Sequence, residues 1–117
     1  MTLRITTGRT EADLERDDLL LFNNVLNEVC NGFTVPAFES SIGAPESHVR
    51  DLLRRIHTLE ADQGVCVPLL NLELSILENA LRETLRELGV EEFSARTGLP
   101  FEFGLAALRE LEKWSSR

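Results

Sequence analysis

The sequence predicts an all-α fold, in which two tandem helical hairpins pack as one bundle with pseudo-twofold symmetry. Three observations predict it. The chain repeats itself at a fixed offset, apolar residues recur at spacings of three and four, and glycines and prolines mark the ends and beginnings of the apolar segments. The 117 residues, 43% of them hydrophobic, are enough to bury one core, so we expect a single domain over residues 1–117.

Residues 18–60 align with residues 73–115 without a gap, and ten of the 43 aligned pairs are identical. Composition alone would give about four identities. The identical pairs are Leu19/Leu74, Asn24/Asn79, Leu26/Leu81, Glu28/Glu83, Val35/Val90, Phe38/Phe93, Gly43/Gly98, Pro45/Pro100, Leu53/Leu108 and Arg54/Arg109. We therefore expect two units, over residues 10–60 and 68–116. Each has a long helix, a short helix, a glycine turn and a second long helix.

The first helix of each unit is predicted from its cap and its apolar stripe. Thr10 can cap a helix whose opening turn is acidic, and Gly32 can end it. The matching helix begins near Asn71 and ends at Gly89, a C′ glycine. The two stripes are Leu19, Phe22, Leu26, Val29, Cys30 and Phe33 in the first helix, and Leu74, Leu77, Leu81, Leu85 and Leu88 in the second.

The second halves of the units are equally parallel. Residues 38–42 and 93–97 are predicted to form single helical turns, ended by Gly43 and Gly98. A proline follows two residues later in both units, where it suits the first turn of the next helix. Residues 60–68 form the linker between the units. A minimal two-strand pairing between residues 3–5 and 65–67 is left open.

The recurring polar residues suggest a structural network. Asn24 and Glu28 share one helix face at a spacing of four, as Asn79 and Glu83 do, and Arg54 and Arg109 each follow 26 positions after the glutamate of their unit. We expect each glutamate to pair with the arginine of its own unit, and each asparagine to bind main-chain groups at a glycine turn. The alternative is a pair of ligand-binding or catalytic carboxylates near the pseudo-twofold axis.

Residues 38–53 resemble a helix-turn-helix motif, with Gly43 in the turn, and residues 93–108 match that motif less well. A DNA-binding regulator is therefore the alternative function. Its base-reading positions would include Ser47, His48 and Arg50, but residues 45–60 carry three acids and three bases. A DNA reader concentrates positive charge where the phosphates run, so the charge pattern disfavours nucleic acid as a partner.

Acidic residues predict a protein partner. The net charge is −8, and residues 11–18 form an acidic block that includes Glu11, Asp13, Glu15, Asp17 and Asp18. We expect this block to open the first helix and to dock a basic partner. Four apolar residues fall outside the main stripes and are compatible with a homodimer contact or a partner groove: Leu20, Leu69, Phe101 and Phe103. The leading hypothesis is a non-enzymatic interaction module, such as an adaptor, an inhibitor or an immunity-type protein.

Enzyme motifs are not found in the sequence. There is no P-loop, no G-x-G-x-x-G and no G-x-S-x-G, and neither His48 nor His57 has a glutamate three positions before it. We expect no enzymatic activity, cofactor or metal site. Cys30 and Cys66 are expected to be buried, reduced thiols. Residues 1–9 lack the apolar stretch of a signal peptide and no apolar run is long enough to cross a bilayer, so we expect a cytoplasmic location.

Two segments carry a family resemblance. N-A-L-R-E at Asn79–Glu83 and E-E-F-S-A-R-T-G at Glu91–Gly98 resemble a family of small uncharacterised bacterial all-α proteins. The resemblance covers mainly the second unit, and in the first unit Ser41 and Ile42 stand at the positions of Arg96 and Thr97. It implies a bacterial, cytosolic origin and implies no activity.

Overall fold

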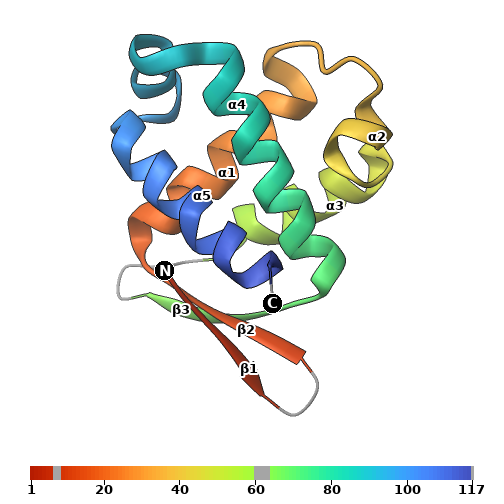
Figure 1. Ribbon diagram of the computed structural model, residues 1–117, viewed down its shortest axis with the longest axis vertical. Helices are drawn as coiled ribbons and strands as arrows, with labels where there is room; N and C mark the ends of the chain where they lie inside the picture. The colour runs from red at the N-terminus through yellow and green to blue at the C-terminus, as the bar shows by residue number, and fades with distance from the viewer. Residues whose placement is uncertain (7–8, 60–63, 117) are drawn as a thin grey trace.

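Five α-helices and one π-helical segment pack against a three-stranded antiparallel sheet in the computed structural model, which describes residues 1–6, 9–59 and 64–116 (Figure 1). The elements are β1 (Thr2–Thr6), β2 (Arg9–Leu14), α1 (Arg16–Asn27), the π-helical η1 (Glu28–Gly32), α2 (Phe38–Ile42), α3 (Glu46–His57), β3 (Val65–Leu69), α4 (Asn71–Thr97) and α5 (Phe101–Ser115). The all-α prediction is therefore wrong. The fold is mixed α/β.

The main error concerns β2, which the sequence analysis assigned to the start of the first helix. The even positions from Thr10 to Leu14 are buried, while the odd positions from Arg9 to Asp13 are partly or fully exposed. This alternation is the two-residue period of a strand with one face on a core. The acidic residues that suggested a helical first turn lie on the outer face of the sheet. The helix begins only at Arg16, with Glu15 as its N-cap.

The strand pairing also differs from the one left open by the sequence. Residues 3–5 and 65–67 do lie in strands, but the strand order is β1-β2-β3, so β2 separates them. Leu3 pairs with Ala12, and Ala12 pairs on its other side with Val67. The alternating burial of β2 was not recognised in the sequence. The segments of β1 and β3 were therefore expected to pair with each other, although each pairs with β2.

The predicted helix over residues 38–42 and the helices after Pro45 and Pro100 are confirmed, whereas the first helix begins at Arg16 and not after Thr10. α2 ends at Gly43, and α3 and α5 follow Pro45 and Pro100 as predicted. The helix of the second unit was expected to end at Gly89, with a single turn over residues 93–97 after it, and α4 consists of two helical segments that meet at a kink at Gly89. Gly89 has φ +70° and ψ −176°, a non-helical conformation that favours glycine and interrupts the helix.

The two units are related by the 55-residue offset throughout. β2 and β3 occupy equivalent positions, so each unit is a strand followed by helices, and Ala12 faces Val67, which is its own equivalent in the other unit. The pseudo-twofold axis therefore passes through this residue pair. α1 and α4 begin at equivalent positions and pack against each other, and α2 of the first unit packs on α4 of the second. Figure 1 shows α1 and α4 crossing above the sheet.

One hydrophobic cluster contains the buried residues of both units. Its tightest point is Gly104 on α5, which stands where the first unit has Val49. A Cβ at Gly104 would lie 2.7 Å from Cζ of Phe93 and 3.0 Å from Cδ2 of Leu85. Phe93 is fully buried and packs edge-to-face on Phe101 at 5.7 Å, so its ring has little room to move.

The variant Gly104→Ala is expected to lower the free energy of unfolding by about 1–2 kcal/mol. Overpacking costs about 1–3 kcal/mol, and the helix-forming preference of alanine over glycine offsets part of this loss. Urea unfolding followed by circular dichroism measures the change. The control is Ala106→Ser on the same helix, an exposed position where a change within about 0.5 kcal/mol is expected. Equal stability of Gly104→Ala and the parent would contradict the packing described above.

Candidate functional site

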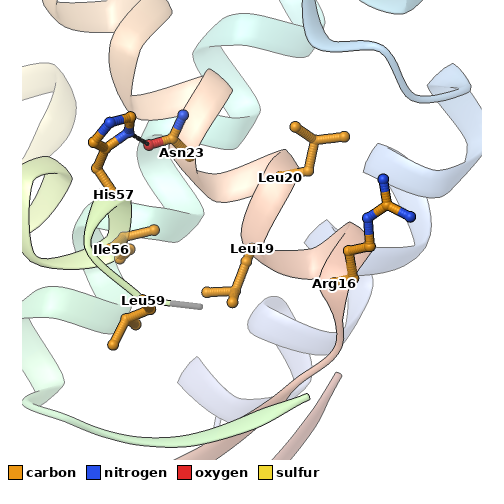
Figure 2. Close-up of a pocket in the computed structure, with 7 residues that line it drawn as sticks. All are labelled: Arg16, Leu19, Leu20, Asn23, Ile56, His57 and Leu59. Carbon is orange, nitrogen blue, oxygen red and sulfur yellow. Dashed lines mark hydrogen bonds between the residues drawn. The ribbon is translucent and has the colours of Figure 1, made fainter. Parts of the chain in front are cut away.

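A groove between α1 and α3 is one of the concave sites formed by the described residues. Its volume is about 270 Å³, and it is lined by Arg16, Leu19, Leu20, Asn23, Ile56, His57 and Leu59. Figure 2 shows Arg16 at one end and His57 at the other, with apolar side chains between them. The groove therefore combines an apolar floor with a polar group at each end.

The His57 end of the groove is held in place by a chain of hydrogen bonds. Nδ1 of His57 lies 3.1 Å from Oδ1 of Asn23, and Nδ2 of Asn23 donates to Oδ1 of Asn24 at 3.2 Å. Because that amide presents its oxygen to the imidazole, the Nδ1 atom of His57 carries the proton. Nδ2 of Asn24 then donates to the main-chain oxygen of Thr97 at 2.8 Å. The groove is thus connected to the end of α4 in the other unit.

The other end of the groove carries a free cation. Arg16 forms no ion pair with any residue in the described parts of the chain, whereas seven other arginines do: Arg4, Arg50, Arg54, Arg55, Arg82, Arg86 and Arg96. Leu20, beside it, keeps 39% of its surface exposed. The groove therefore presents an arginine without an ion pair to a described residue next to a partly exposed leucine.

The second unit lacks this combination. At the positions equivalent to Arg16, Leu20 and His57, it carries Asn71, Ser75 and Glu112. There, Nη2 of Arg82 binds Glu78 at 2.7 Å and lies 3.6 Å from Glu112, which bridges α4 to α5. No site is predicted here from the sequence. A comparison of the two units could have found it, because the residues beside the apolar stripe of each first helix differ in charge between the units.

The two recurring asparagines bind main-chain oxygens across the pseudo-twofold axis. Asn24 binds Thr97, just before Gly98, and Nδ2 of Asn79 donates to the main-chain oxygen of Ile42, just before Gly43, at 2.9 Å. Thr97 and Ile42, the acceptor residues, are buried. The glycine that follows each of them adopts a positive φ. Each asparagine therefore satisfies the helix end of the other unit, and not of its own.

The expected glutamate–arginine pairs do not form. Arg54 pairs with Asp51 on its own helix, Glu83 pairs with Arg86, and Arg109 has no ion pair among the described residues. Both partners lie three positions away on the same helix, where side chains meet without tertiary structure. The prediction that Glu28 meets Arg54 and that Glu83 meets Arg109 is therefore wrong.

Glu28 instead pairs with the other unit. Its Oε1 lies 2.7 Å from Nη2 of Arg96, an ion pair that lacks hydrogen-bond alignment, and the same guanidinium donates to the main-chain oxygen of Gly32 at 3.2 Å. The Glu28 side chain is only 10% exposed. A side chain at Gly32 would collide with this carboxylate, so the glycine leaves room for the pair.

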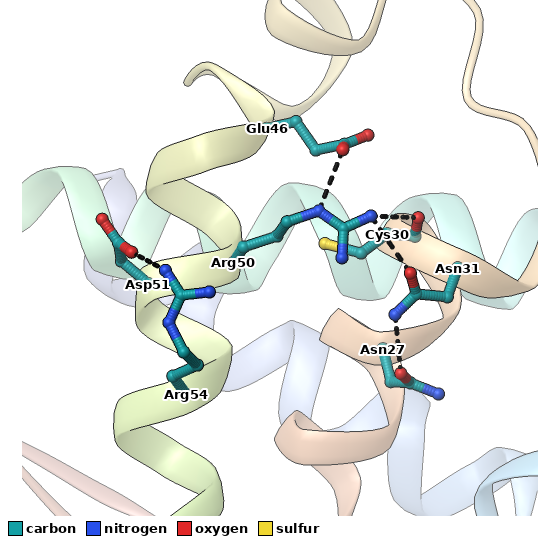
Figure 3. A network of polar contacts seen from close by, with 7 residues as sticks. All are labelled: Asn27, Cys30, Asn31, Glu46, Arg50, Asp51 and Arg54. Atoms are coloured by element: carbon teal, nitrogen blue, oxygen red, sulfur yellow. Dashed lines mark hydrogen bonds and ion pairs between the residues drawn. The ribbon is translucent and has the colours of Figure 1, made fainter.

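Arg50 is a candidate base-reading residue of the helix-turn-helix hypothesis, but its side chain is hydrogen-bonded within the protein (Figure 3). Its Nε donates to Glu46 at 3.0 Å, and its Nη2 donates to the main-chain oxygen of Cys30 and to Oδ1 of Asn31, both at 3.0 Å. These contacts attach α3 to η1. With Arg50 and Arg54 both paired to carboxylates, α3 does not present the free positive charge that DNA phosphates require.

The acidic block does not form one surface. Asp18 is buried, accepts a hydrogen bond from the main-chain nitrogen of Glu15 at 2.9 Å and lies 3.1 Å from the amino group of Met1. Arg4 lies 2.9 Å from Asp13 and 3.7 Å from Glu11 on the outer face of the sheet. Only Glu15 and Asp17 remain as exposed carboxylates without an ion pair to a described residue. Because β2 replaces the expected first helical turn, the block is divided between a strand and a helix.

The leftover apolar residues are mostly covered. Leu69 is 2% exposed and Phe101 and Phe103 are partly buried, which leaves Leu20 as the exposed one. The cysteines are both free, but Cys66 is exposed and Cys30 only partly buried, so the prediction of two buried thiols is wrong.

The two thiols are weak nucleophiles. Burial raises the pKa of the Cys30 thiol, with Arg50 acting in the opposite direction. Local desolvation, together with Asp13 and Glu11, raises the pKa of the Cys66 thiol. Both thiols therefore stay protonated near neutral pH, and thiolate is the reactive form. The described residues contain no cluster of three potential metal ligands, and none of their helices is both long and apolar enough to cross a membrane.

Comparisons with known proteins found no matching family model, no similar curated protein and no similar solved structure.

Replacing Asn24 or Asn79 by alanine is expected to lower the free energy of unfolding by about 1–3 kcal/mol each. The loss leaves a buried main-chain oxygen without its donor. Urea midpoints measure the effect. Asn27→Ala is the matched control, because Asn27 lies on α1 and is exposed. If the two variants unfold at the midpoint of the control, the cross-unit bonds do not stabilise the fold.

Arg96→Met is expected to cost about 2–3 kcal/mol, because it leaves the mostly buried Glu28 carboxylate without a cation. Combining it with Glu28→Gln should recover part of the loss, and the double-mutant cycle gives the coupling energy. A coupling energy near zero would show that the two side chains act independently.

Proposed function

We propose that the chain is a non-enzymatic protein-interaction module, of the adaptor, inhibitor or immunity-type class, and that it docks its partner in the α1–α3 groove. The observation that carries the proposal is the exposed Leu20 beside Arg16, which has no ion pair to a described residue although seven other arginines do. Exposed apolar surface rimmed by polar groups is typical of protein contact sites.

The size of the groove supports a side chain as its occupant. Pockets for small molecules have volumes of about 300–1,000 Å³ and bury most of the ligand. The groove offers about 270 Å³ and is open to solvent. It is therefore suited to a single anchor residue, and such anchors supply most of the binding energy at protein interfaces.

The acidic block is not the basis of this proposal. Three of its carboxylates face a cation of the same chain, and Asp18 is buried. Glu15 and Asp17 flank Arg16 in the chain at the start of α1, but neither lines the groove. Exposed charges near a docking site affect the rate and selectivity of association more than its strength.

The variant Leu20→Ser is expected to lose the partner without unfolding, because serine is the residue of the second unit at this position. Tagged protein is used to capture its partner, and the affinity of the purified pair is then measured by calorimetry. An anchor leucine lost from a docking groove should weaken binding about tenfold or more.

Leu72→Ser is the control, because Leu72 is a similarly exposed leucine on α4, at 45% exposure. Equal binding by Leu20→Ser, Leu72→Ser and the parent would overturn the proposed docking site. Light scattering of the free chain shows whether a second copy is the partner.

A further inference from the structure

We propose that the groove accepts the C-terminal residue of a partner polypeptide, a large aliphatic residue with its free carboxylate. This inference rests on the proposed docking function and specifies the chemistry of the partner. The aliphatic side chain would lie on the apolar floor, and the carboxylate would bind Arg16.

The apolar floor defines the first requirement. Leu19 and Ile56 belong to the hydrophobic core, at 6% and 2% exposure, and Leu59 packs against that core. Leu20 rises beside them as the exposed wall. An aliphatic side chain placed on this floor is removed from water, which favours binding by roughly 25 cal/mol per Å² of apolar area buried.

The charge at the groove defines the second requirement. The chain carries a net charge of −8, so an anionic ligand is repelled by most of its surface. Arg16 lines the groove without an ion-pair partner among the described residues, and its planar guanidinium can bind both oxygens of a carboxylate. An anion is therefore favoured at this end of the groove.

One residue must meet both requirements, because the groove accommodates one anchor. An aspartate or glutamate in mid-chain carries its carboxylate at the tip of its own side chain, which leaves no aliphatic group for the floor. A C-terminal aliphatic residue has the carboxylate on its main chain and the apolar group on its side chain. The groove therefore fits a chain end better than an internal segment.

The far end of the groove suits the preceding main chain of such a peptide. Nδ1 of His57 and the amide oxygen of Asn23 are bound to each other. Nε2 of His57 can accept a hydrogen bond from a peptide N–H, and the second N–H of the Asn23 amide can donate to a peptide carbonyl. The hydrogen bond to Asn24 holds the Asn23 amide in this orientation before the ligand arrives.

The second unit supports a single site per chain. At the equivalent positions Glu78 and Glu112 place two carboxylates, bridged by Arg82, and Asn71 stands in place of the cation. A ligand carboxylate would be repelled there. We therefore expect one peptide to bind per chain.

The test is a titration of the ¹⁵N-labelled full chain, followed by NMR chemical shifts, with acetyl-alanyl-alanyl-leucine as the free acid. We expect saturable shifts at the groove with one peptide per chain. The C-terminal amide of this peptide should bind at least about threefold more weakly, and the difference should shrink as salt rises from about 0.05 M to 0.5 M. Acetyl-trialanine, which has the carboxylate but not the aliphatic side chain, should also bind more weakly.

Two variants copy the second unit and are therefore compatible with the fold. Arg16→Asn should remove the difference between acid and amide, whereas Leu20→Ser should weaken both peptides. Arg109→Asn is the control, since Arg109 is another arginine without an ion pair to a described residue and lies outside the groove. It should leave both affinities unchanged.

Equal affinity for acid and amide, or no shift at the groove with either, would overturn the inference. The docking function is tested separately. If Leu20→Ser loses the captured partner while the peptides show no binding, docking stands and the C-terminal specification fails. If the acid binds at the groove while Leu20→Ser keeps its partner, the proposed docking function fails.

Discussion

The antiparallel pairing of β2 with β3 is the constraint on which the rest of the structure depends. Because Ala12 faces its own equivalent, Val67, this pairing fixes the axis that relates the two units. Helices leaving the two strands must then cross, and the cross-unit bonds of Asn24 and Asn79 follow from that geometry. Each unit supplies a donor that the other unit's helix end requires, so neither unit satisfies its buried polar groups alone. The strand register therefore determines both how the helices of the two units cross and which helix end each asparagine binds.

The same axis shows where the two units have diverged in their interactions. Arg55 pairs with Glu73 at 2.8 Å, whereas at the equivalent place Glu110 cannot neutralise Asp18, and the amino group of Met1 lies beside that carboxylate instead. Similarly, the polar contacts of Arg50 are replaced at the equivalent position by a leucine packed on the core. In both cases each unit forms a stabilising contact at the position, but the two units use different groups to form it. The groove differs in kind, because its cation has no ion pair to a described residue and its leucine keeps 39% of its surface exposed.

The sequence predicted the helices because their apolar period is long and their ends carry glycine and proline. It missed β2 because Glu11 and Asp13, on the exposed face of the strand, resemble the acidic first turn of a helix. The bonds of the asparagines reach across the axis, and their partners depend on how the units pack. The pairing of Glu28 with Arg96 has no counterpart at the 55-residue offset, since Ser41 and Glu83 occupy the equivalent positions, so repetition could not predict it. Local signals therefore gave the elements, and the packing of the units gave the contacts.

A repeated fold provides its own reference for what stability requires. Leu19 and Leu74 stand at equivalent positions and are buried in both units, so packing in the core explains both residues. Where one unit exposes a leucine and the other a serine, as at Leu20 and Ser75, the backbone plainly accepts either. The exposed leucine costs solubility and contributes little to the core, so folding does not explain it. Its position beside Arg16, over an apolar floor, is the observation on which the proposed docking site rests.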